Sequence, residues 1–142
     1  MDDLELVKKE LHEGTSSLIL VRDGRILSRK NGSGIAPLLQ LVTEERELLK
    51  GAVLGDKVIG RAAALLTVDK ELSLLYTPLI SEEAINILKG RVLYSYLKEV
   101  PFILRRDGKG QCPVESRVKD LVNPDIAEKV IREFVESISK SV

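Results

Sequence analysis

The chain has 142 residues, 44% hydrophobic and 31% charged, so it is long enough to bury the core of one domain without disulfides or metals. Lysine plus arginine and aspartate plus glutamate both number 22, and this zero formal net charge argues against a nucleic-acid-coating or polybasic membrane-surface protein. The single cysteine favours a reducing cytoplasm, no signal peptide is recognisable, and no apolar run approaches the roughly 18 residues of a membrane span.

The first half of the chain predicts a helix, a β-hairpin, a second helix and a strand. Apolar residues at helical spacing follow Asp2 and stop at Gly14, which predicts the first helix. Two strand-like runs, at 17–22 and 25–29, flank Asp23-Gly24, a pair that tolerates positive φ and therefore favours a tight hairpin turn. Helical spacing over 35–49 and an apolar run over 51–55 predict the next helix and strand.

The second half of the chain alternates helices and strands. We expect a small-residue helix over 58–66 and a strand over 72–76 that ends at Thr77-Pro78. Ser81 is expected to cap a helix that reaches Lys89 and has acidic residues in its first turn. A fifth strand is expected at about 92–97, a short helix after Cys112-Pro113, and a last amphipathic helix over 125–138.

This order of elements predicts one α/β domain over residues 1–142, because no repeat, linker or low-complexity segment divides the chain. The expected architecture is a three-layer α/β/α sandwich with a five-stranded mixed sheet. The hairpin supplies the antiparallel strands, and the later strands are parallel because helices connect them.

Several segments of the chain resemble a known family. These segments are Ser17-Leu18-Ile19-Leu20 through Asp23-Gly24, Asp56-Lys57-Val58-Ile59-Gly60-Arg61-Ala62-Ala63-Ala64, Ser81-Glu82-Glu83-Ala84 and Cys112-Pro113. On them the chain resembles, over nearly its whole length, an uncharacterised prokaryotic family catalogued as domain of unknown function 1893. The resemblance implies a cytidine-deaminase-like fold, and by analogy with proteins of that fold a homodimer, but it assigns no reaction.

Zinc deaminases hold their metal with a His-x-Glu segment and a Pro-Cys-x-x-Cys segment at two neighbouring helix starts. This chain has Asp56–Arg61 at the first place and Thr77–Glu82 at the second, and neither segment contains histidine or cysteine. Its single histidine, His12, belongs to the first predicted helix, and Cys112 has no partner in a CxxC pair. Three zinc ligands are therefore missing, so we expect no metal, no other cofactor and no zinc-dependent deamination.

Asp56, Lys57 and Arg61 are the first candidate site residues, because they stand where a predicted strand passes into a helix. Asp56 is either a ligand-contacting carboxylate, general base or nucleophile, with Lys57 tuning its charge, or a simple N-cap of the helix. Lys57 and Arg61 are four residues apart, so on one helix they would share a face and form a small site for phosphate. The alternative is that both are ordinary surface charges.

Ser81 and Cys112 are the remaining candidates. Ser81 is expected beside the Asp56 loop, where its hydroxyl or N–H would contact a ligand, unless it only caps its helix. The segment 77–83 is then expected to form the wall of the pocket opposite Asp56. Cys112 precedes a predicted helix and is either a nucleophile or a buried structural thiol, with no histidine near it in the sequence to act as base.

These residues support three hypotheses, and they leave open whether the protein is an enzyme. The first is binding of a nucleotide or another phosphorylated ribose compound, with Asp56 at the ribose or reacting centre and Lys57 and Arg61 at phosphate. The second is a regulatory or assembly module that has the fold without the chemistry. The third is a transferase or hydrolase that depends on Cys112. The expected partner is thus a small molecule, with neither nucleic acid nor membrane as a partner.

Overall fold

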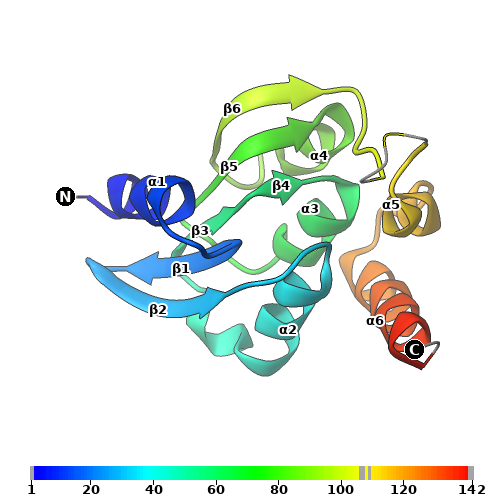
Figure 1. The fold of residues 1–142 in the computed structure, drawn as a ribbon, viewed down its shortest axis with the longest axis horizontal. Coiled ribbons are helices and arrows are strands. Elements are labelled where there is room, and N and C mark those ends of the chain that lie inside the picture. Colours follow the sequence, from blue (N-terminus) through cyan, green and yellow to red (C-terminus); the bar gives the residue numbers. More distant parts are fainter. Residues whose placement is uncertain (1, 106–107, 109, 141–142) are drawn as a thin grey trace.

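The computed structural model describes residues 2–105, 108 and 110–140, and over these residues the fold is a mixed α/β sandwich. Helix α1 lies on one face of a central sheet, and helices α2 to α6 lie on the other (Figure 1). In chain order the elements are α1 (Asp3–Glu13), β1 (Leu18–Arg22), β2 (Arg25–Lys30), α2 (Ala36–Glu44), the 3-10 turn η1 (Arg46–Leu48), β3 (Val53–Asp56), β4 (Val58–Ile59), α3 (Arg61–Thr67), β5 (Leu74–Ser81), α4 (Glu82–Leu88), β6 (Tyr94–Val100), α5 (Pro113–Val118) and α6 (Pro124–Lys140).

The sheet is mixed, as the sequence predicts. Strand β1 pairs antiparallel with β2 and with β3, whereas β3, β4 and β6 all pair in parallel with β5. The hairpin turn is the predicted one, since Asp23 and Gly24 have φ angles of 52° and 76°. The Asp3 carboxylate accepts both N–H groups of this turn, at 3.0 and 2.7 Å, and so ties α1 to the hairpin.

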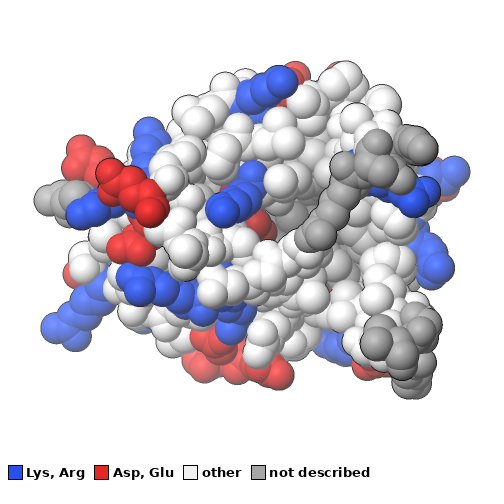
Figure 2. All heavy atoms as spheres, viewed as in Figure 1, with Lys and Arg blue, Asp and Glu red and all other residues white. Residues whose placement is uncertain are grey.

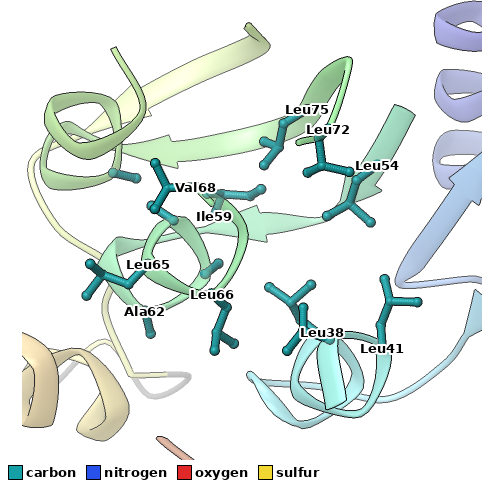
Figure 3. Close-up of a cluster of buried hydrophobic side chains, with 14 of the residues drawn as sticks. Leu38, Leu41, Leu54, Ile59, Ala62, Leu65, Leu66, Val68, Leu72 and Leu75 are labelled. Atoms are coloured by element: carbon teal, nitrogen blue, oxygen red, sulfur yellow. The ribbon is translucent and has the colours of Figure 1, made fainter. Parts of the chain in front are cut away.

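Two hydrophobic clusters fill the spaces on the two sides of the sheet. Val7 and Leu11 of α1 pack against one face of β1 and β3, and the buried Tyr76 of β5 belongs to the same cluster. The larger cluster lies between the other face and the remaining helices, where Leu38 of α2 and Leu66 of α3 converge (Figure 3). The alternation of side chains along β1 explains this division, because neighbouring residues point to opposite faces.

Strands β3 and β4 behave as one strand that is interrupted at Asp56 and Lys57. Val53 to Gly55 of β3 and both residues of β4 pair with the β5 residues 21 positions later, so the register continues across the interruption. Leu54 and Ile59 nevertheless both belong to the larger core cluster, although their odd separation would place them on opposite faces of a regular strand. The chain therefore rotates at Asp56–Lys57, and this is where the candidate site lies.

Two predicted boundaries in this region are wrong. Val58 and Ile59 form β4 rather than the first turn of a helix, so α3 begins at Arg61 and the described sheet has six strands instead of five. Strand β5 also continues through Pro78 to Ser81 rather than ending at Thr77-Pro78. Pro78 is tolerated because it has no ladder partner among the described residues of the neighbouring strands.

Strand β6 is the outer edge of the sheet in Figure 1. Its outer side pairs with no other strand in the part of the chain that the structure describes, and its large apolar side chains Tyr96 and Leu97 are 40% and 64% exposed. No helix among the described residues is long and apolar enough to cross a membrane.

Candidate functional site

A cavity of about 610 Å³ opens beside the interruption between β3 and β4. Its walls come from this interruption, from the start of α3, from the segment before α2 and from the chain that enters α5. Most of the lining is apolar, and the lining residues are Ser17, Gly32, Ser33, Gly34, Ile35, Pro37, Asp56, Lys57, Val58, Gly60, Ala62, Ala63, Ile103, Leu104, Arg105, Cys112, Pro113, Val114 and Glu115. A cavity of this size and character is typical of small-molecule sites.

Asp56 and Lys57 lie together at this cavity, as predicted. Asp56 is the last residue of β3 and pairs with Leu18 of β1, and the Lys57 N–H donates to the Ser17 carbonyl at 3.1 Å. Asp56 is half-buried, whereas the side chain of Lys57 is exposed. Removal of water raises the pKa of Asp56 from 3.8 to about 7, although hydrogen bonds from the Val58 and Lys57 N–H groups oppose this increase.

The second interpretation of Asp56, as the N-cap of the following helix, is wrong. The N-cap of α3 is Gly60, which has no side chain to accept a hydrogen bond. Glu115 of α5 does the capping instead, since its two carboxylate oxygens accept the N–H groups of Arg61 at 2.6 Å and Ala62 at 2.7 Å. Gly60 permits this approach, because a Cβ there would lie 1.9 Å from Glu115 Oε1.

Glu115 is buried, and burial raises the pKa of its carboxyl, although the two N–H groups of α3 favour the charged form. It lines the cavity, but both of its oxygens are already engaged by α3. Sequence reasoning missed this residue because its partners lie 54 and 53 positions away, and no local pattern marks such a contact.

Arg61 is not arranged as predicted. Lys57 lies in the bend before β4 and Arg61 begins α3, so the two residues do not share a helix face. The Arg61 guanidinium donates to the carbonyl of Val118 at 2.9 Å and to the carbonyl of Leu121. These bonds fasten the end of α5 to α3, and Arg61 does not line the cavity. Of the two cations predicted to hold phosphate, the structure places Lys57 at the cavity.

Ser81 is a helix cap, as one of its two interpretations states. Its Oγ accepts the N–H of Ala84 at 3.1 Å, and the residue is fully buried. The expectation that 77–83 forms the opposite wall is wrong, because β5 continues to Ser81 and this segment does not line the cavity. The opposite walls come instead from 32–37, 103–105 and 112–115.

Cys112 lines the same cavity as Asp56. It is half-buried at the N-cap position of α5, where its N–H donates to the Ile103 carbonyl at 2.9 Å. His12, by contrast, lies in α1 and its Nε2 is 2.7 Å from the hydroxyl of Tyr76. Because α1 covers the opposite face of the sheet, His12 is not available as a base for Cys112.

In the part of the chain that the structure describes, no three His, Cys, Asp or Glu side chains are grouped closely enough to hold a metal ion. The absence of zinc stays a prediction.

Basic side chains are dispersed among acidic and uncharged ones on the face that contains the hairpin and the sheet edge (Figure 2).

The fold and the cavity thus define a mixed α/β domain with the Asp56 carboxyl in a cavity at the interruption between β3 and β4. The family model for domain of unknown function DUF1893, named TM1506, matches residues 6–135, and the chain belongs to this family. A crystal structure of a DUF1893 family protein, TM1506 from Thermotoga maritima, is similar to this chain with a TM-score of 0.81 and 26% sequence identity. The similarity covers 92% of this chain and 88% of that one. No curated protein matches the chain.

Proposed function

We propose that this protein binds a nucleoside or nucleotide in the Asp56 cavity. The observation that carries the proposal is the half-buried Asp56 carboxyl in the wall of a largely apolar cavity of about 610 Å³. Removal of water at this place raises the pKa of the carboxyl to about 7. Strongly shifted carboxyls in a cleft are typical of sites that bind or transform a ligand. Asp56 makes no ion pair among the described residues, and its carboxyl is held only by the backbone N–H groups of Lys57 and Val58.

The shape of the site divides the ligand into two parts. The apolar walls, which include Val58, Ala63 and Leu104, favour the flat face of a heterocyclic base. A ribose or phosphate group then lies toward the exposed Lys57, which supplies positive charge near the cavity. Arg61 takes no part in phosphate binding in this proposal, since its guanidinium is engaged by the end of α5.

Thermal unfolding and calorimetric titration with adenosine, cytidine and their 5′-monophosphates test the proposal. We expect millimolar or tighter binding, which corresponds to about −4 kcal/mol or better. In Lys57→Ala the monophosphates should lose their advantage over the nucleosides, whereas Lys129→Ala on the exposed surface of α6 is the matched control and should change nothing. If none of these compounds binds at millimolar concentration, the proposal fails and a regulatory or assembly module takes its place.

Cys112 supports a second candidate, a thiol-dependent transferase or hydrolase that uses the same cavity. The observation in its favour is that Cys112 and Asp56 line one cavity although they are far apart in the sequence. In this candidate Asp56 is the proton acceptor for the thiol, directly or through a water molecule. The rate of Cys112 alkylation against pH tests it: a fall in that rate in Asp56→Asn supports the candidate, and an unchanged rate excludes it.

A further inference from the structure

The outer edge of β6 is an open strand edge that carries little charge. Its backbone pairs with β5 on one side, and no other described strand pairs with its outer side. Strand β2, at the opposite edge of the sheet, has three cations among its six residues, Arg25, Arg29 and Lys30, and such charges keep strand edges from pairing. The charged residues of β6 are Lys98 and Glu99, whose charges cancel. The two edges of one sheet are thus protected to different degrees.

Large apolar side chains gather along the same edge of the sheet. Four of them lie in or next to β6, and their exposed fractions are 73% for Leu93, 40% for Tyr96, 64% for Leu97 and 49% for Phe102. The surface along this edge is mainly uncharged (Figure 2). At about 200 Å² for a large side chain, the exposed parts of these four amount to roughly 450 Å². Two such surfaces in contact approach the roughly 1,000 Å² of a specific interface before the polar atoms of the strand are counted.

We infer that two copies of this chain form a symmetric dimer in which their β6 strands pair antiparallel and join the two sheets into one. A twofold axis perpendicular to the sheet uses the same edge of both copies, so the assembly closes at two chains. Pairing of β6 with β2 of another copy would instead repeat without end. Pairing of two β2 edges would bring their cations together, whereas two β6 edges have no net charge to repel each other. This dimer is independent of the proposed nucleoside binding.

The pairing with β5 determines which backbone groups of β6 are available to a second copy. The Leu93 carbonyl accepts the Leu75 N–H at 2.9 Å, so Leu93 and every second residue after it direct their backbone groups toward β5. The even-numbered residues of 94–100 therefore direct their N–H and C=O groups outward. When the two strands overlap over all of 94–100, Tyr96 lies opposite Lys98 of the second copy, and the two residues exchange a pair of hydrogen bonds.

This register places Leu97 on the twofold axis. Leu97 then faces the same residue of the second copy in a pair without mutual hydrogen bonds, where the Cα atoms are about 4.5 Å apart. Lys98 lies beside the ring of Tyr96 of the second copy, where a cation is attracted to the aromatic face. A register centred on Lys98 would place two ammonium groups opposite each other, and one centred on Tyr96 would shorten the paired segment to 94–98. Full overlap is therefore the favoured register.

Sedimentation equilibrium of the wild-type chain tests the dimer itself, which we expect at micromolar concentrations. Lys98→Pro tests the strand pairing, because it removes an outward N–H and leaves the ladder with β5 intact, a position at which edge strands tolerate proline. This variant should sediment as a monomer while its circular dichroism spectrum stays that of wild type.

Disulfide crosslinking tests the register, in a Cys112→Ser background that removes the natural thiol. Leu97→Cys should give a covalent dimer under mild oxidation, because the two Cα atoms lie within disulfide range. Tyr96→Cys is the matched control and should remain uncrosslinked, because in this register its two copies are more than about 7 Å apart.

A wild-type chain that sediments as a monomer up to about 0.1 mM overturns the inference. A dimer in which Leu97→Cys does not crosslink, or crosslinks no better than Tyr96→Cys, also overturns it, as does a folded Lys98→Pro variant that stays dimeric. Sedimentation of wild type needs no variant, so the inference is tested even if a substitution prevents folding. Every measurement is made without ligand, and a failure of nucleoside binding therefore leaves the result unchanged.

Discussion

Asparagine in place of Asp56 tests the environment of this carboxyl without changing the shape of the side chain. In the folded protein the pKa of Asp56 is about 7, whereas an aspartate in the unfolded chain has a pKa near 3.8. At pH values between these two pKa values, Asp56 holds a proton in the folded state that it has released in the unfolded state. The free energy of unfolding therefore falls as the pH rises from about 4 to 7 and is level above that range. The contribution of Asp56 to this fall in the free energy of unfolding is absent from the Asp56→Asn variant.

The size of the effect follows from the displacement of the pKa. About three pKa units at about 1.36 kcal/mol each correspond to roughly 4 kcal/mol. Asp56 is only half-buried, so water that reaches the carboxyl makes this value an upper bound. We expect wild type and Asp56→Asn to have similar stability at pH 4, and the variant to be more stable by about 2–4 kcal/mol at pH 8.

Urea unfolding of both proteins at pH 4, 5, 6, 7 and 8 measures this difference. The pKa of Glu115 is also raised by burial, but Glu115 is present in both proteins and its contribution cancels when the two are subtracted. Asp120→Asn on the exposed surface is the matched control and should show the pH dependence of wild type. A difference between wild type and Asp56→Asn that stays constant from pH 4 to 8 would refute the reasoning, because it would show a carboxyl with an ordinary pKa.

Three further substitutions test other parts of the structure. Arg61→Ala should lower the free energy of unfolding by roughly 1.5–3 kcal/mol and leave adenosine binding unchanged, and the opposite pattern would restore Arg61 as a ligand-binding residue. Gly60→Ala should cost about 1–3 kcal/mol in urea unfolding because its Cβ would collide with Glu115, and unchanged stability would contradict that contact. If the expected homodimer forms along the edge of β6, Leu97→Lys should convert the dimer to monomers in sedimentation experiments. Val122→Lys is the control and should leave the dimer intact, and a monomeric wild-type protein would exclude such a dimer.

The elements that the sequence predicts well are those whose cause is local. Asp23 and Gly24 adopt the positive φ angles that the hairpin requires. Ser81 caps the helix that follows it by accepting the N–H of Ala84, three residues later. Asn123 likewise accepts the first N–H groups of α6. Each of these features depends on residues within one turn of the chain, which a sequence pattern can reveal.

The errors have a common physical cause, which is competition from distant partners. Val58 and Ile59 are compatible with a helix start, but β5 pairs with them and draws them into the sheet. A strand is expected to stop at Pro78, but Leu79 beyond it pairs with Val58 of β4 and with Lys98 of β6, and these partners extend β5. The missing N–H of Pro78 does no harm, because no described neighbouring strand pairs with it. Arg61 has the features of a phosphate ligand, and its partners at the end of α5 are 57 and 60 residues away.

Glu115 caps α3, the role that one interpretation of the sequence gives to Asp56, and the two carboxyls should therefore affect stability in opposite ways. The first N–H groups of a helix need an acceptor, and Glu115 supplies both of its oxygens to α3. Glu115→Ala should therefore lower the free energy of unfolding by about 1–3 kcal/mol, because two N–H groups of α3 lose their partner. The Asp56 carboxyl accepts only N–H groups of the next two residues, Lys57 and Val58, and its raised pKa means that ionisation reduces stability at neutral pH. Urea unfolding at pH 8 distinguishes the two: Glu115→Ala should be less stable than wild type and Asp56→Asn more stable. Two losses of similar size would instead make Asp56 a second structural carboxyl and remove the reason to place a ligand beside it.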